Sequence, residues 1–316
     1  MIRTILRRNP YLFTLLLLFV AVGVNWYLQP NLFEPRPLSG NFRTFLPLIV
    51  LAAGQTIVVI AGGIDLSVGA IVSLAAAILV TQLAPDAAPA AFVGVVALAG
   101  LAGMAAGAVN GFCVTVLRLQ PIVTTYATSF IFGGLALTIL PRPGGAMPEE
   151  IARFYRREMP LGLPVGVYVI IGVILLWLLL RQTRYGRYLF AVGGQPEAAY
   201  ASGVPVNVVR FTSYMISGLM AAMAAVVLTL NTGSGDPRIG DAMTLDSVVA
   251  VVLGGTRLSG GQGGIAGTVL GVIVLGLVRN IISFANVPTW WQTLVDALII
   301  VVALAMPGLL RLLRRK

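Results

Sequence analysis

The chain has 316 residues, of which 58% are hydrophobic and only 10% are charged. A water-soluble domain could not bury that much apolar surface, so the composition predicts an all-α integral membrane protein. The net charge of +10 does not indicate nucleic-acid binding, because the arginines stand at the ends of apolar blocks. They form no basic stripe with interleaved aromatic residues, and they are better explained as determinants of orientation in the bilayer.

Missing residue types exclude further classes of protein. There is no histidine and one cysteine, Cys113, so histidine bases, His/Cys metal clusters and disulfides are excluded. The only lysine is Lys316, so the chain contains no phosphate-binding loop of the G-x-x-x-x-G-K-[ST] type. We therefore expect no catalytic residues, no metal and no cofactor in this chain, and we expect any ATP to be hydrolysed by another polypeptide.

Apolar length and arginine position predict about ten spanning helices, since roughly 20 residues cross a hydrocarbon core. The expected spans are residues 11–28, 44–60, 66–83, 91–117, 121–140, 165–180, 208–230, 245–256, 263–282 and 290–309. Arginines before the first span and after the last predict that both ends face the cytoplasm, as an even number of spans requires. The same rule places residues 181–207 in the cytoplasm and leaves 141–164 as the longest periplasmic loop. We expect residues 1–316 to form a single transmembrane domain in a bacterial inner membrane.

Two expected spans are interrupted. The stretch Leu245 to Gly255 is only about 16 Å long as a helix, and we expect it to be a short spanning segment. A re-entrant loop here would reverse the following spans and export the arginine-rich tail. The second interruption follows Ile60, and both carry one pattern on the cytoplasmic side. Gly62-Gly63-Ile64-Asp65-Leu66-Ser67 aligns with Gly254-Gly255-Thr256-Arg257-Leu258-Ser259, 192 positions later, which indicates a weak internal repeat.

The acid in the first copy of this pattern can act in two ways. Asp65 stands at the entrance of an apolar helix, where an unpaired charge is costly, so it must be capped, paired or hydrated. It can cap the helix that begins at Leu66, or it can pair with Arg257 across a cytoplasmic gate. The two roles can coexist.

Polar side chains within the spans are candidates for a translocation path. They are Gln55, Asn110, Thr124, Thr125, Ser217 and Asn280. Amides and hydroxyls suit weak, transient binding of a sugar, whose hydroxyl groups must exchange water for other hydrogen-bond partners. The alternative for each is an interhelical hydrogen bond that holds two spans together. Gly103, Gly107 and Gly111 share one helix face at a spacing of four residues and predict close helix packing.

The predicted cytoplasmic segment contains a short capped helix. Pro196 suits the first helical position, Glu197 complements the positive end of the helix dipole, and Gly203 can end the helix. Ala198 and Ala199 favour helix between them. A surface helix that merely closes the loop is one interpretation, and a compact element gripped by another protein is the other.

These stretches together resemble a known family. The spacing E-A-A-x-x-x-G from Glu197 to Gly203 is similar to the motif by which permeases of ATP-binding-cassette importers dock into their ATPase partners. With the Gly62 to Gly69 stretch, Asn110-Gly111 and its following Gln120 to Thr125, and Leu245-Asp246 running into Gly254 to Gly261, it resembles the ribose-type sugar permease family. That family also carries galactose-, xylose- and galactofuranose-class substrates. The resemblance covers Gly54 to Leu310. The sequence departs from the family pattern at Gln195, Thr244, Thr125 and Tyr126.

The resemblance implies function and partners. It implies the permease subunit of an importer for a small sugar, bound to ATPase subunits, to a periplasmic binding protein and to a second permease, identical or paralogous. The Pro148 to Glu158 stretch reads as an amphipathic helix on the outer membrane surface, with Glu149 four residues before Arg153, where a binding protein could dock.

Other functions remain open. A secondary transporter coupled to protons or sodium would need intramembrane acids, and only Asp65 lies near a span break. A membrane enzyme would need nucleophiles, bases or metal ligands within the spans, and without histidine the chain has almost none. Within the importers, autoinducer-type sugars, nucleosides and branched-chain amino acids are alternative cargoes.

Overall fold

A computed structural model of the chain describes residues 12–285 and isolated positions between 288 and 301. The described residues form twelve α-helices, one short 3-10 turn (Pro160–Gly162) and no β-strand. The helices are α2 (Leu12–Leu28), α3 (Pro35–Ile60), α4 (Val68–Gln82), α5 (Pro89–Thr115), α6 (Pro121–Ile139), α7 (Glu149–Arg157), α8 (Val165–Gln182), α9 (Arg184–Gly194), α10 (Pro196–Ala201), α11 (Val206–Thr232), α12 (Met243–Leu253) and α13 (Ile265–Phe284).

The predicted all-α membrane architecture is confirmed. Six helices, α3, α5, α6, α8, α11 and α13, are long and apolar enough to cross a membrane, and α2, α4 and α12 are shorter apolar helices. Each expected span up to 263–282 coincides with one of these nine helices. The expected span 290–309 lies outside the residues that the structure describes continuously.

The core of the bundle depends on small residues between α5 and α11. A Cβ added to Gly103 or Gly107 would collide with the backbone of α11, and one added to Gly111 would lie 2.9 Å from the backbone oxygen of Phe211. The two helix backbones are therefore in direct contact along this face. The glycine spacing predicted this packing, which lets helices associate where lipid offers no hydrophobic driving force.

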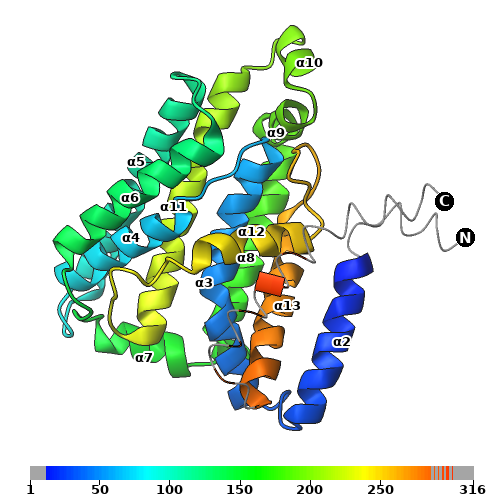
Figure 1. The fold of residues 1–316 in the computed structure, drawn as a ribbon. Helices are drawn as coiled ribbons and strands as arrows, with labels where there is room; N and C mark the ends of the chain where they lie inside the picture. The colour runs from blue at the N-terminus through cyan, green and yellow to red at the C-terminus, as the bar shows by residue number, and fades with distance from the viewer. Residues whose placement is uncertain are drawn as a thin grey trace, which may run out of the picture.

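The two ends of the bundle carry different elements. Figure 1 shows α9 and α10 at one end and α7 at the opposite end. The α9 end carries the exposed arginines Arg181, Arg184 and Arg187, so it is the end that the positive-inside tendency predicts to face the cytoplasm. Helix α7 then lies on the outer side, where Glu149 and Arg153 form the expected i,i+4 ion pair at 3.9 Å. Burial of Tyr155 in α7 raises the pKa of its hydroxyl above the usual range, which nearby Arg43 partly offsets.

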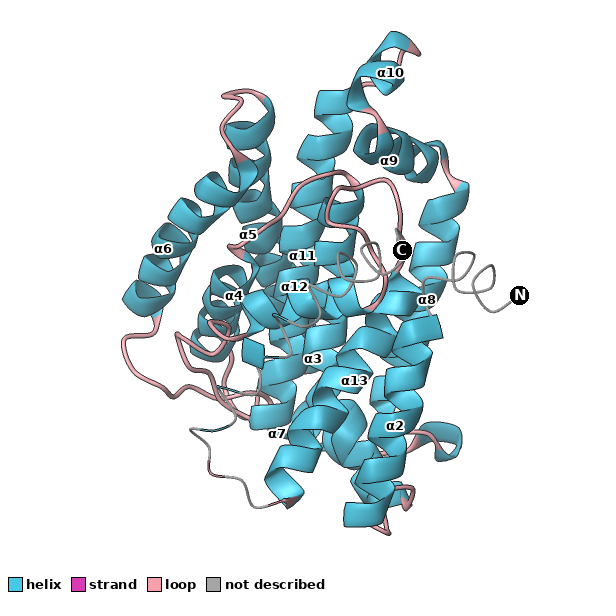
Figure 2. Ribbon diagram, turned by 45° about the vertical axis from the view of Figure 1, so that its right-hand side comes forward, coloured by secondary structure: helices cyan, strands magenta, loops and turns pink. Residues whose placement is uncertain are grey.

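The short helices α4 and α12 lie in the interior of the bundle (Figure 2). Helix α12 runs antiparallel to α13: Asp246 contacts Arg279 in the outer part, and Gly254 packs against Gly267 in the inner part. This direction is that of a short spanning segment. The chain from the outer end of α11 folds back inward along α4, where the Gly240 N–H donates to Ser73 Oγ at 3.0 Å. Helix α12 alone is too short to cross the membrane, and the loop between α11 and α12 covers the remaining part of the distance.

Candidate functional site

The break between α3 and α4 holds a fully buried carboxylate. Asp65 Oδ1 accepts hydrogen bonds from the Ser67 N–H (2.9 Å) and the Ser67 hydroxyl (2.7 Å). The amide of Asn110 on α5 donates to Ser67 Oγ at 2.7 Å and lies 3.5 Å from Asp65 Oδ1. Thr128 on α6 donates to Asn110 Oδ1 at 2.6 Å. We call Asp65, Ser67, Asn110, Thr125 and Thr128 the Asp65 cluster.

The Asp65 cluster fixes the start of α4. The Leu66 N–H donates to Thr125 Oγ1 at 2.9 Å, so three helices meet at the break through polar side chains. Asp65 is not the N-cap of this helix: α4 begins at Val68, its N-cap residue is Ser67, and no side-chain capping bond is made there. Asp65 instead accepts the N–H of Ser67, two residues further along the chain. It forms no ion pair with Arg257, whose side chain is exposed. Thr128 was not among the sequence candidates, although its place one turn after Thr125 on α6 could have indicated it.

The two glycine breaks end their helices in the same way. Gly62 (φ 86°) follows α3 and Gly255 (φ 81°) follows α12, both in the left-handed conformation that favours glycine. In each, the following N–H bonds back into the last turn: Gly63 to Val58 O (2.9 Å) and Thr256 to Val251 O (3.1 Å). The helix ends thus match at a spacing of 193 residues, one more than the sequence alignment. This is a common way for a helix to end, and it falls one residue away from the sequence alignment, so it does not make Asp65 and Arg257 equivalent positions.

The two breaks and the end of α9 meet backbone to backbone. The Gly261 N–H donates to Ile60 O at 2.9 Å, which joins the segment after α12 to the end of α3. A Cβ added to Gly193 would lie 2.6 Å from Gly261 N and closer still to Ile60 O. A Cβ on Gly260 would lie 2.7 Å from Gly193 O and 3.0 Å from the Cα of Gly62. We call Ile60, Gly62, Gly193, Gly260 and Gly261 the glycine joint.

The predicted short cytoplasmic helix is present as α10. It begins with Pro196 and ends before Gly203, which has φ 80° and donates its N–H to Tyr200 O at 2.9 Å. Glu197 and Ala198 are exposed, whereas Ala199 packs against the protein. No neighbouring atom lies within 4 Å of a Cβ built on Gly203, so only its backbone angle demands glycine. Helices α9 and α10 thus form a projecting element joined through Gly193 to the spans.

The path candidates divide by environment. Gln55, Asn110, Thr125 and Ser217 are fully buried and Thr124 nearly so. Asn280 donates to Asn41 Oδ1 at 3.0 Å, an interhelical bond of the kind weighed against a path role. Both side-chain polar atoms of Gln55 lack a hydrogen-bond partner. A buried amide without hydrogen-bond partners is costly. Gln55 therefore fits the alternative role, an interhelical hydrogen bond that holds two spans together, less well than Asn280 does.

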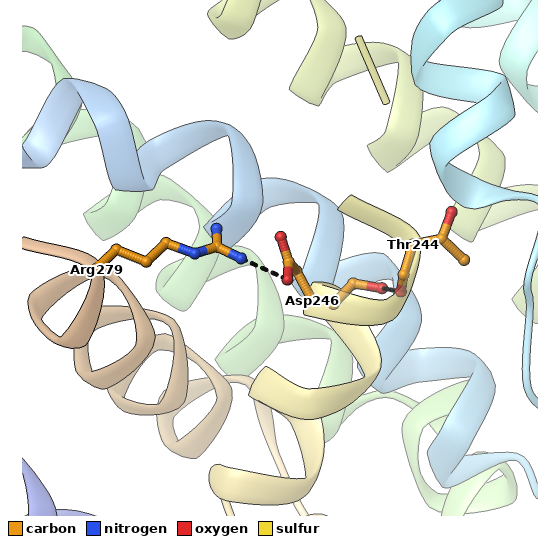
Figure 3. A network of polar contacts seen from close by, with 4 residues as sticks. Thr244, Asp246 and Arg279 are labelled. Carbon is orange, nitrogen blue, oxygen red and sulfur yellow. Dashed lines mark hydrogen bonds and ion pairs between the residues drawn. The ribbon is translucent and has the colours of Figure 1, made fainter. Parts of the chain in front are cut away.

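The sequence did not indicate an ion pair between α12 and α13, in which the arginine side chain is partly exposed. Arg279 on α13 approaches Asp246 Oδ1 on α12 at 2.6 Å (Figure 3), close to where the Ser247 hydroxyl donates to Thr244 O at 2.7 Å. Asp246 lies in the first turn of α12, whose N-cap residue, Ala242, makes no side-chain capping bond. An acid near the start of a short helix carries no signal that its partner lies 33 residues away.

A cavity of about 600 Å³ lies between α4, α6 and the loop before α12. Its wall includes Leu66 next to Asp65, Tyr126 and Phe130 of α6, and Arg238 and Asp241 of the loop. None of the six path candidates lines it. Two positions that depart from the family pattern, Tyr126 and Thr244, both do. We call it the outer cavity.

The broken helices, the polar break and the projecting cytoplasmic helices define a membrane transport subunit. The chain belongs to the permease family described as branched-chain amino acid transport system / permease component, whose profile matches residues 38–304. It is 34% identical to the ribose import permease protein RbsC of Bacillus subtilis over 290 residues, which cover 90% of this chain and 89% of that protein. It is 34% identical to the fructose import permease protein FruG of Bifidobacterium longum, covering 84% and 80%. It is 30% identical to the D-allose transport system permease protein AlsC of Escherichia coli K12, covering 94% and 91%. No solved structure matches the chain.

This membership sets the chain's place in transport. It is the multi-pass membrane permease of an ATP-binding-cassette importer, a subunit without catalytic function or cofactor. ATP is hydrolysed by partner ATPase subunits, and a binding protein delivers the cargo.

Proposed function

We propose that this chain moves a small sugar across the inner membrane as one of two permease subunits, identical or paralogous, in a complex with two ATPase domains. In this proposal, residues 1–316 form one transmembrane domain, with 181–207 as the coupling segment and 141–164 as the periplasmic loop that faces the binding protein. The sugar cargo rests on the likeness to ribose, fructose and D-allose permeases over most of the chain.

The observation that carries the coupling role is the glycine joint. Helix α10 projects into the cytoplasm with Glu197 and Ala198 exposed, where an ATPase can grip it. Helix α9, directly before it, ends with Gly193 and Gly194, and the backbone of Gly193 touches Gly261 and Ile60 without an intervening side chain. Closely packed backbone transmits a displacement because it has no soft side chain to absorb it. A push on α10 therefore reaches both helix breaks.

The two glycine breaks, after α3 and after α12, are the segments that such a displacement would move. Gly62-Gly63 and Gly254-Gly255, with Asp65 and Ser67 after the first and Arg257 and Ser259 after the second, form the flexible cytoplasmic ends of α3 and α12. Hinges in transport proteins lie at element ends that can absorb changes in φ and ψ. The residues Gln55, Asn110, Thr124, Thr125, Ser217 and Asn280 are proposed to face the sugar when these ends move apart.

Co-purification with ATP hydrolysis tests the proposal. Tagged permease is expressed with its cognate ATPase and purified in nanodiscs, and native mass spectrometry gives the subunit ratio. We expect two permeases with two ATPase domains, and ATP hydrolysis stimulated by binding protein loaded with sugar. A permease that purifies alone, or stimulation only by binding protein loaded with a branched-chain amino acid or nucleoside, would contradict the proposal.

A further inference from the structure

The outer cavity has the dimensions and chemistry of a ligand site. Its volume of about 600 Å³ lies within the range of small-molecule sites in proteins. Small residues line it on two helices, Gly133 and Gly134 on α6 and Ala70 on α4. Because they have little or no side chain, they leave the space between the helices open. The interior polar residues predicted for the path are packed shut, whereas this cavity is accessible.

One wall of the outer cavity is aromatic. Tyr126 and Phe130 stand one turn apart on α6, with ring centroids 5.0 Å apart at 80°. Their side chains are 57% and 65% exposed, so neither ring is needed to fill the protein core. The faces of aromatic rings attract partly positive hydrogen atoms, such as the C–H groups on the apolar face of a sugar ring.

The facing wall is polar and of mixed charge. The loop before α12 contributes Arg238 and Asp241. The Arg238 N–H donates to Asp236 Oδ1 at 2.8 Å and the Asp241 N–H to Arg238 O at 3.1 Å, so local turns fix both backbones. A carboxylate and a guanidinium together offer acceptors and donors to neighbouring sugar hydroxyls without imposing a large net charge.

The inner end of the outer cavity touches the break. Leu66 lines the cavity, and its N–H is held by Thr125 Oγ1 of the Asp65 cluster. Thr244 lines it too, and its hydroxyl accepts the N–H of Gly69 at 3.1 Å. A molecule in the cavity therefore lies against the start of α4, next to the segment that must move for passage inward.

We propose that the outer cavity is a monosaccharide site on the transport route, in which Tyr126 and Phe130 stack on the ring of the sugar and Asp241 and Arg238 bind its hydroxyls. This inference rests on the proposed function and adds the place and the residues that select the cargo. Stacking on aromatic rings depends little on the exact orientation of the sugar. The sugar is therefore bound weakly enough to be released along the transport route.

The first experiment is uptake by the complete importer, with permease, ATPase and binding protein, in proteoliposomes. The probes are labelled D-ribose, D-allose and D-fructose, with leucine as a fourth. We expect Tyr126→Ala to lower sugar uptake about three- to tenfold and to change the preference among the sugars. Tyr126→Phe retains the ring and should retain uptake. ATP hydrolysis stimulated by loaded binding protein should persist, because the cavity is remote from α9 and α10.

Matched variants separate the site from its surroundings. Ile131→Ala truncates another exposed apolar residue of α6 outside the cavity and should match the unaltered chain. Asp241→Asn should lower sugar uptake, while Asp86→Asn, an exposed acid elsewhere on the outer side, should not. If Tyr126→Ala and Asp241→Asn import every sugar as the unaltered complex does, or alter only leucine uptake, the inference is wrong. If the unaltered complex imports no sugar at all, the proposed function fails instead.

A second measurement does not depend on uptake. Gly134 lines the cavity, and no atom lies within 4 Å of a Cβ built there, so Gly134→Cys in a Cys113→Ser chain should fold normally. We expect D-ribose to slow maleimide labelling of Gly134→Cys several-fold in the permease–ATPase complex without binding protein. Labelling of Asp86→Cys should be unchanged. Equal labelling of Gly134→Cys with and without each of the three sugars would overturn the assignment.

Discussion

Adding one methyl group to the glycine joint should uncouple ATP hydrolysis from transport. A Cβ on Gly193 would lie 2.6 Å from Gly261 N, 0.4 Å inside the 3.0 Å closest approach of real Cβ atoms, and nearer still to Ile60 O. Both neighbouring groups are backbone, so α9 itself must move away from the two breaks. Overpacking of this kind costs about 1–3 kcal/mol. An equal shift in the coupling equilibrium corresponds to a loss of about fivefold to a hundredfold.

Gly194→Ala is the matched control for Gly193→Ala. Both glycines belong to α9, so both changes raise helix propensity alike, but a Cβ on Gly194 meets nothing within 4 Å. The assay measures sugar imported per ATP hydrolysed, together with co-purification of the ATPase. We expect Gly193→Ala to bind the ATPase and hydrolyse ATP while importing little sugar, and Gly194→Ala to behave as the unaltered chain. Equal transport per ATP in the two variants would refute the joint as the route of coupling.

Three further predictions follow from the site. Gly203→Asp forces a side chain into a left-handed conformation, at about 1–2 kcal/mol, and should weaken ATPase co-purification while leaving membrane insertion intact; unchanged co-purification would remove α10 as the docking element. Asp65→Asn and Arg257→Gln should reduce uptake with additive free energies, within about 0.5 kcal/mol, since the two groups have separate surroundings; a larger coupling energy would restore the gate pair. Asp246→Asn should lower the unfolding free energy by at most about 1 kcal/mol and the thermal midpoint slightly, because the ion pair at 2.6 Å is lost but the arginine side chain is partly exposed; an unchanged midpoint would show that the pair adds no stability.

Features set by neighbouring residues could be predicted from the sequence. The start of α10 at Pro196 and its end before Gly203 follow from local helix signals, and the close packing along α5 follows from glycine spacing alone. The positions of nine apolar helices follow from apolar length, six of them long enough to cross a membrane, because the bilayer demands long apolar segments.

Features that join distant segments could not be predicted. The glycine joint brings together residues near 60, 193 and 260, and each of these glycines alone reads as a turn or a helix end. The pairing of Asp246 with Arg279 depends on the antiparallel course of α12 and α13. The outer cavity could not be predicted for the same reason: Tyr126 and Asp241 line one cavity only because the loop after α11 folds back into the bundle.

Uptake of labelled sugar into proteoliposomes, with each component omitted in turn, tests the central claim most directly. The account predicts that sugar accumulates only when the permease, its ATPase, loaded binding protein and ATP are all present, and that a proton or sodium gradient cannot replace ATP. Accumulation by the permease alone, or accumulation driven by an ion gradient without the ATPase, would contradict it.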